Sequence, residues 1–199
     1  PMTRSIDYYF SVISPWSYLG DARLRAIASR HQATLNHKPI SPTTVFSRTG
    51  GLQLKDRSDQ RKAYRMQELT RWRDHLGIEL TLEPRFFPAN DQLAHGTVVA
   101  ARQSGEDPSD LVHALMRACW VEDQDIADPS VVSAALMAVG LDVEKLITLA
   151  KSEASRNEVD ANTEEAISRG VFGVPAYLIG DQLFWGQDRL NFVERALAH

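Results

Sequence analysis

Three short segments of the sequence carry residues that could do chemistry. The first is Ser14-Pro15-Trp16-Ser17, where a strand-like run gives way to a helical pattern. Its simplest role is to start a helix, because the Ser14 hydroxyl can cap the helix and Pro15 suits the first helical position. A hydroxyl beside the free N–H groups and positive dipole of a helix N-terminus also suits an anion. A thiolate is such an anion, and this environment lowers the pKa of a thiol.

The second segment is Gly170-Val171-Phe172-Gly173-Val174-Pro175. Proline is disfavoured at the start of a central strand unless the geometry is special, and a cis bond is the usual special case. A cis Val174–Pro175 bond would expose the backbone N–H and C=O of Val174, so that a peptide-like ligand could pair with them as an extra strand. The alternative is an edge-strand proline without a ligand.

The third segment is Trp185-Gly186-Gln187-Asp188-Arg189, where a strand ends and a helix begins. Asp188 would most simply cap that helix. In a ligand site its carboxylate would instead pair with an ammonium group, while nearby N–H groups would take a carboxylate.

These segments lie at junctions between predicted elements. The apolar pattern predicts an opening β-α-β unit, whose two strands are expected to be parallel, and a closing β-β-α unit whose strands are joined at Gly180-Asp181. Residues 41–56 are polar and are interpreted as a loop. The predicted strands are 6–13, 34–40, 174–179 and 182–185, and the predicted helices are one from residue 15, then 60–76, 93–103, 110–121, 130–139, 143–150, 153–169 and 188–197.

This order predicts an α/β protein with a thioredoxin-like fold and an inserted all-helical domain. The thioredoxin-like part is assigned to 1–50 and 171–199, and the insertion to 51–170. In such a frame a Cys-x-x-Cys redox pair would lie at Ser14 and Ser17, and both positions are serine here.

The composition excludes several classes of protein. The 199 residues are 43% hydrophobic and 24% charged, which is typical of a globular protein. The net charge of −4 argues against a protein that binds nucleic acid, because such proteins are usually basic. The longest mostly apolar stretch, Val131 to Leu141, is too short to span a membrane, and the N-terminus shows no apolar signal segment. We therefore expect a cytoplasmic protein that binds neither nucleic acid nor membrane.

The single cysteine and the histidines point away from redox and metal chemistry. Cys119 lies on the apolar stripe of its predicted helix and is expected to be a buried, inert thiol, with no second cysteine for a disulfide. The six histidines show no spacing typical of a zinc site, so no metal is expected.

Together the three segments resemble two related enzyme families, the 2-hydroxychromene-2-carboxylate isomerases and the kappa-class glutathione transferases. Both belong to the disulfide-oxidoreductase-A-like branch of the thioredoxin fold. The residues that carry the resemblance are the run from Asp7 to Leu19, the Val171–Pro175 and Trp185–Leu190 runs, Arg71-Trp72, Gly77-Ile78 and Phe87-Pro88-Ala89-Asn90.

The resemblance implies a glutathione site. Ser14 matches the catalytic serine that hydrogen-bonds the glutathione sulfur, and Val174 matches the residue that pairs with the cysteinyl backbone. Gln187 and Asp188 match the pair that holds the γ-glutamyl end, and Asn90 matches a residue at the substrate side. Because family members are commonly dimers, a homodimer is expected.

Two features qualify the substrate side. The isomerases carry a basic residue in the loop after the second strand, where Pro42 to Ser47 offers none, and a tyrosine where Asp91 stands here. The basic cluster Arg57, Arg61, Lys62 and Arg65 is interleaved with acids and is interpreted as a solvated helix face, from which Lys62 could still reach a glutathione carboxylate.

The predicted function is therefore a glutathione-dependent isomerase of aromatic compound catabolism. It would interconvert 2-hydroxychromene-2-carboxylate and an o-hydroxybenzylidenepyruvate-type aryl keto acid by reversible thiolate addition. Two alternatives stay open: a kappa-class transferase that conjugates glutathione to small electrophiles, and a redox-inactive thioredoxin-like module that binds an extended peptide beside Val174.

Overall fold

The computed structural model describes residues 4–199, so the first three residues of the predicted 1–50 part lie outside it. The elements in chain order are β1 (Ser5–Phe10), α1 (Pro15–Arg30), β2 (Thr34–Pro39), α2 (Pro42–Thr49), the 3₁₀ helix η1 (Leu54–Asp56), α3 (Asp59–Leu76), α4 (Gln92–Gln103), α5 (Ser109–Trp120), α6 (Pro129–Ala138), α7 (Val143–Ala150), α8 (Glu153–Ser168), β3 (Ala176–Ile179), β4 (Gln182–Trp185), the 3₁₀ helix η2 (Gln187–Arg189) and α9 (Leu190–Leu197).

Four strands form one mixed sheet in the order β2-β1-β3-β4. β1 and β2 are parallel, whereas β3 runs antiparallel to both β1 and β4. Tyr8 of β1 lies opposite His37 on one side and Tyr177 on the other. The parallel opening pair and the closing hairpin are therefore confirmed, and with them the thioredoxin-like α/β fold.

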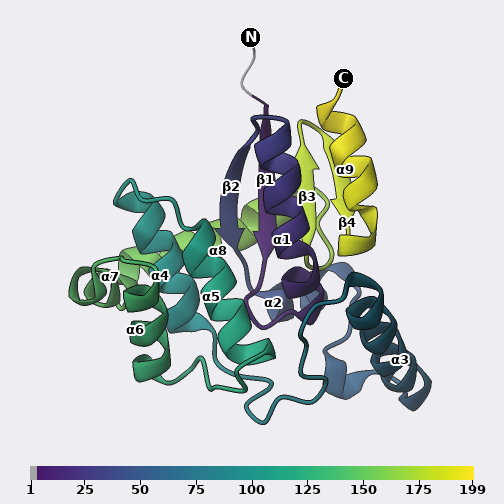
Figure 1. Ribbon diagram of the computed structural model, residues 1–199, viewed down its shortest axis with the longest axis horizontal. Coiled ribbons are helices and arrows are strands. Elements are labelled where there is room, and N and C mark those ends of the chain that lie inside the picture. Colours follow the sequence, from purple (N-terminus) through teal and green to yellow (C-terminus); the bar gives the residue numbers. More distant parts are fainter. Residues whose placement is uncertain (1–3) are drawn as a thin grey trace.

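Alternate residues of β1 point to opposite faces of the sheet, as the period of a strand requires. Ile6, Tyr8 and Phe10 pack in one core cluster with α1 and α9, and Tyr9 packs in a second cluster with Ala166 of α8. Figure 1 shows α1 and α9 in front of the sheet and α8 behind it. α8 thus covers a sheet face, while the boundaries at 51 and 170 remain predictions.

The first cluster continues from the sheet through α1 into the helices that follow β2. α1 contacts α5, whose apolar stripe includes the buried Cys119 and Trp120. Burial raises the pKa of the Cys119 thiol to about 12, which keeps it protonated and inert, as the sequence predicted. Among residues 4–199, no helix combines the length and apolar character needed to cross a membrane.

The prediction of a loop over residues 41–56 is wrong, because this segment contains α2 and η1. Ser41 caps α2 by accepting a hydrogen bond from the N–H of Thr44 at 3.3 Å, and Gly50 ends the helix with a φ of 84°. α2 has eight residues and buries only Val45, so its apolar periodicity is too short to register in the sequence.

Three predicted boundaries also shift. β1 ends at Phe10 rather than at residue 13, because the chain turns there and the N–H of Ser14 donates to the carbonyl of Ser11 at 3.0 Å. β3 begins at Ala176, after the proline, which has no N–H to contribute to the sheet. The closing helix is divided into η2 and α9.

Candidate functional site

Ser14 lies at the junction between β1 and α1 and caps the helix. Its Oγ accepts a hydrogen bond from the N–H of Ser17 at 3.1 Å, and its side chain is largely buried. Within residues 4–199 the Ser14 hydroxyl proton has no acceptor, so it is available to a ligand at the positive end of α1.

Helix α4 holds the turn that leads to Ser14. The N–H of Val12 donates to Nε2 of His95 at 3.1 Å, and the Ser11 hydroxyl donates to Asp91 at 3.3 Å. Since Nε2 accepts, the ring proton is on Nδ1, which lies 3.6 Å from the Asp91 carboxylate. Burial lowers the pKa of His95 against the opposing charge of Asp91, which keeps the ring neutral and able to accept.

These two α4 residues were missed by the sequence analysis. Asp91 was noted only as a departure from a family tyrosine, and His95 only as one of six histidines without zinc spacing. Their spacing of four residues places both on one helix face, which is a weak signal. Their role becomes visible only when the fold brings α4 against the turn after β1.

The helix η2 packs closely on the N-terminal half of α1. A Cβ atom at Gly20 would lie 2.8 Å from Cβ of Gln187 and 2.9 Å from the hydroxyl oxygen of Tyr177, so this contact requires glycine. Arg23 donates to the side-chain oxygen of the buried Gln187 and, at 3.4 Å, to its carbonyl. Arg23 is thus a third residue that the sequence analysis missed, and it fixes the orientation of Gln187.

Asp188 does not cap the last helix, contrary to one reading of the sequence. It is the middle residue of η2, whose N-cap is Gly186 with a φ of 96°, and the N-cap of α9 is Arg189. The Asp188 side chain is 45% exposed and its carboxylate lies 3.5 Å from Arg189. The carboxylate therefore stays accessible at the surface, where it can take an ammonium group.

The Val174–Pro175 peptide bond is cis, as predicted. The carbonyl of Pro175 accepts a hydrogen bond from the N–H of Gly186 at 2.9 Å, which ties this segment to η2. In the part of the chain that the structure describes, the N–H and C=O of Val174 have no hydrogen-bond partner. Because Tyr9 pairs with Ala176, Val174 precedes β3 on the side toward the turn before α1.

We use one name for the elements described so far. The β1–α1 turn, the Val174 segment and η2 together are called the Ser14 side.

Asn90 and Lys62 lie on other elements. Asn90 is exposed before α4, where its side-chain oxygen accepts from the N–H of Gln92 at 2.9 Å, and its neighbour Asp91 contacts the turn before Ser14. Lys62, on α3, donates to the carbonyl of Lys55 at 3.1 Å. No described contact joins Lys62 to the Ser14 side. We call residues 54–76, which include η1 and α3, together with residues 84–90, the α3 side.

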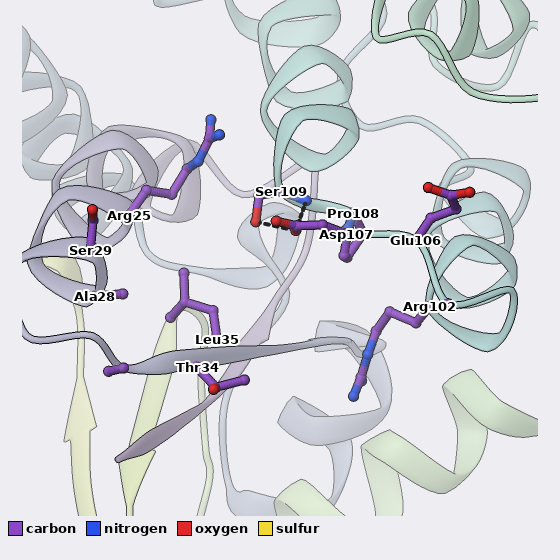
Figure 2. A pocket seen from close by; sticks show the side chains of 12 residues that line it. Arg25, Ala28, Ser29, Thr34, Leu35, Arg102, Glu106, Asp107, Pro108 and Ser109 are labelled. Atoms are coloured by element: carbon purple, nitrogen blue, oxygen red, sulfur yellow. Dashed lines mark hydrogen bonds between the residues drawn. The ribbon is translucent and has the colours of Figure 1, made fainter. Parts of the chain in front are cut away.

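A cavity of about 600 Å³ opens elsewhere, between α1, β2 and the α4–α5 loop (Figure 2). Several of its polar groups are already engaged: Asp107 accepts from the Ser109 N–H at 2.9 Å, Arg102 donates to the His37 carbonyl at 2.7 Å, and Arg25 pairs with Asp110. None of the predicted site residues lines it, so its size alone does not make it the functional site.

Comparisons with known proteins agree with this fold. Residues 5–198 match the family described as DSBA-like thioredoxin domain. The chain belongs to this family. A 2-hydroxychromene-2-carboxylate isomerase of Sphingobium xenophagum is 32% identical over 198 residues, which cover 98% of this chain and 99% of the relative.

Two further relatives extend the comparison. Glutathione S-transferase kappa 1 of Homo sapiens is 26% identical, over 99% of this chain and 92% of its own. A solved structure of 2-hydroxychromene-2-carboxylate isomerase aligns with a TM-score of 0.82 and 29% identity, over 98% of this chain and 94% of its own. The predicted family and fold are confirmed, and the relatives support an enzyme of the isomerase or glutathione-transferase type.

Proposed function

We propose that this protein is a glutathione-dependent isomerase that interconverts 2-hydroxychromene-2-carboxylate and an o-hydroxybenzylidenepyruvate-type keto acid. The observation that carries the proposal is the Ser14 hydroxyl, which caps α1 and keeps its proton free for an anion. The full-length relative named 2-hydroxychromene-2-carboxylate isomerase supports this choice of reaction.

The Ser14 side fits glutathione group by group. The free N–H and C=O of Val174 suit the cysteinyl backbone, and the accessible Asp188 carboxylate suits the γ-glutamyl ammonium group. Gln187 is held in place by Arg23 beside it. Lys62 would extend this set to a glutathione carboxylate, and Asn90 would face the substrate.

Bound glutathione would supply a thiolate that adds reversibly to a conjugated carbon, so that a double bond can rotate as a single bond and then be restored. Ser14 would donate its hydroxyl proton as a hydrogen bond to the sulfur. The N-terminus of α1 adds its positive dipole, and together they favour the charged form of the sulfur. His95 and Asp91 hold the turn that positions Ser14.

Turnover of 2-hydroxychromene-2-carboxylate with and without glutathione tests the proposal. We expect isomerisation only with glutathione, and recovery of the glutathione unchanged. A glutathione adduct as the product would favour the kappa-class transferase, which the relative at 26% identity supports as the second candidate. Absence of retention on a glutathione matrix would contradict both and leave the peptide-binding module.

A further inference from the structure

Four cations on the α3 side have no carboxylate partner within 4.0 Å in the described part of the chain. They are Arg57, Arg61, Lys62 and Arg65. The sequence indicated that neighbouring acids balance this cluster, but Glu68 pairs with Arg71 at 2.6 Å instead. Other arginines nearby are paired, as Arg73 is with Asp74 at 2.9 Å. The local positive charge is therefore uncompensated.

Two of these arginines are half-buried against aromatic rings. The Arg57 guanidinium lies 5.6 Å from the ring centre of Phe46 in α2, and that of Arg65 lies 5.7 Å from the ring centre of Phe87. Arg57 also donates to the carbonyl of Leu52 at 3.1 Å. The two guanidinium groups thus join α2, η1, α3 and the 84–90 segment. They are not a solvated helix face.

Arg85 shows what the pair lacks. Its guanidinium stacks on Phe86 at 5.2 Å, and it also pairs with the Asp123 carboxylate at 2.6 Å. Arg57 and Arg65 have the ring without the carboxylate. The contact between a guanidinium group and a ring is therefore joined by an ion pair at Arg85, whereas at Arg57 and Arg65 it is not.

The two guanidinium groups also repel one another. Burial lowers the pKa of both Arg57 and Arg65, and the charge of Arg57 lowers the pKa of Arg65 further. A partly buried cation without a partner destabilises the protein. An anion placed between two such cations would pair with both and offset their repulsion. Arginine suits a carboxylate, because its planar group donates two parallel hydrogen bonds.

The surroundings of the pair indicate the rest of the ligand. Phe46, Phe87 and the 54% exposed Leu52 offer apolar contacts to a flat ring. The Phe87 segment leads to Asp91, which contacts the turn before Ser14, and α3 itself contacts α1. Figure 1 shows α2 and α3 at the end of the sheet where α1 begins. A carboxylate held by the pair would leave its aromatic portion on the side of Ser14.

We propose that Arg57 and Arg65 bind the carboxylate of an aryl-substituted organic acid, the second substrate of the site. The inference rests on the proposed glutathione-dependent activity and assigns the electrostatic contact that residues 42–47 of α2 do not provide. Glutathione itself stays on the Ser14 side, apart from the carboxylate that Lys62 would hold.

Three matched substitutions test this assignment: Arg57→Gln, Arg65→Gln and, as the control, Arg61→Gln. Each removes one unpaired positive charge, but Arg61 contacts no ring. We expect the KM for 2-hydroxychromene-2-carboxylate to rise about ten-fold or more in the first two, as for a lost hydrogen bond to a charged group, and about two-fold at most in the control. The KM for glutathione should stay within about two-fold in all three, because the pair lies outside the glutathione contacts.

A binding experiment on the wild-type protein needs neither turnover nor variants. Calorimetric titration with salicylate and with its neutral analogue salicylamide separates the carboxylate from the ring. We expect salicylate to bind about ten-fold more tightly, and Arg65→Gln to remove that preference while leaving salicylamide unchanged. Equal binding of both probes by the wild-type protein would overturn the assignment.

Two further outcomes would also overturn it. Equal losses in Arg61→Gln and Arg65→Gln would mean that only the net charge matters, and a selective rise in the KM for glutathione would move the pair to the glutathione contacts. Failure of the proposed function looks different: the wild-type protein would show no glutathione-dependent turnover, while the salicylate titration would still decide whether the arginine pair binds an aryl carboxylate.

Discussion

The Ser14 side and the α3 side of the candidate site differ in how many of their polar groups are paired within the protein. On the Ser14 side, the turn before α1 is held by the hydrogen bonds that it donates to His95 and Asp91, and the contact between Gly20 and Gln187 fixes η2. On the α3 side, two half-buried guanidinium groups have aromatic neighbours but no carboxylate partner among residues 4–199. The preorganised Ser14 side suits glutathione, which is the same in every turnover. The α3 side, whose positive charge is unpaired, suits a ligand that carries a negative charge.

The largest effect is expected at Ser14. Ser14→Ala should keep the fold, at a cost of about 1 kcal/mol for the lost cap, and reduce the turnover rate about 100-fold, because it removes a preorganised donor to the sulfur. Ser17→Ala is the matched control, since Ser17 contributes its backbone N–H to the cap and its hydroxyl has no partner. Steady-state kinetics at saturating glutathione measure both, and normal turnover by Ser14→Ala would contradict the mechanism.

The close contact between α1 and η2 should come next. Gly20→Ala would place a methyl group 2.8 Å from Gln187, and we expect the KM for glutathione to rise about ten-fold as η2 is displaced. Gly140→Ala is the control, because its φ of 75° also makes the substitution strained and it follows α6, which packs on α4, α5 and α7. Both variants should unfold at lower temperature, but a similar change in the glutathione KM would remove the special role of η2.

A smaller effect is expected at Asp188. Asp188→Asn should raise the KM for glutathione a few-fold and leave kcat nearly unchanged, because a half-exposed carboxylate is screened and a remote contact contributes uniform binding. Asp181→Asn, in the exposed hairpin turn, removes the same charge away from the site. Glutathione titration of both variants decides the role of Asp188, which an unchanged affinity would exclude.

The smallest effect concerns pH. His95 accepts from the Val12 N–H only while neutral, and burial lowers its pKa below the usual 6.5. Its contribution to stability is therefore full above about pH 6.5 and is lost as the pH falls through the lower folded-state pKa. His37, whose pKa burial lowers to about 4, acts in the same direction.

His95→Gln separates the two histidines, because glutamine keeps an acceptor that does not titrate. Thermal unfolding measured from pH 7 to pH 4 should show the wild-type protein losing stability more steeply than the variant, with His37 common to both. Parallel curves would mean that His95 does not support the turn through its neutral ring.

The sequence was sufficient for the parts of this account that rest on local rules. Ser14-Pro15 after a strand-like run predicts the start of a helix. The two-residue turn at Gly180-Asp181 fixes the register of the closing hairpin. The cis Val174–Pro175 bond followed from the position of the proline in a strand.

The remainder depends on contacts between residues far apart in the chain. Gly20 appears in the sequence as an ordinary helix residue, and its need for glycine arises only from Gln187, which packs on it. The basic residues of α3 look balanced by nearby acids, but the pairs that form depend on side-chain directions that spacing does not determine. α2 was missed because eight residues with one buried side chain leave almost no periodic signal.

The central claim is that Ser14 and the N-terminus of α1 stabilise the thiolate of bound glutathione. A free thiol titrates at a pKa of about 8.5, and thiolate, unlike thiol, absorbs in the near ultraviolet, so a pH titration of the complex reads the bound value directly. We predict a pKa at least about one unit lower in the wild-type complex, corresponding to about 1.4 kcal/mol of preferential thiolate binding, and a value close to that of free glutathione in Ser14→Ala. A bound sulfur that titrates as it does in water, or a shift that Ser14→Ala retains in full, would contradict the account.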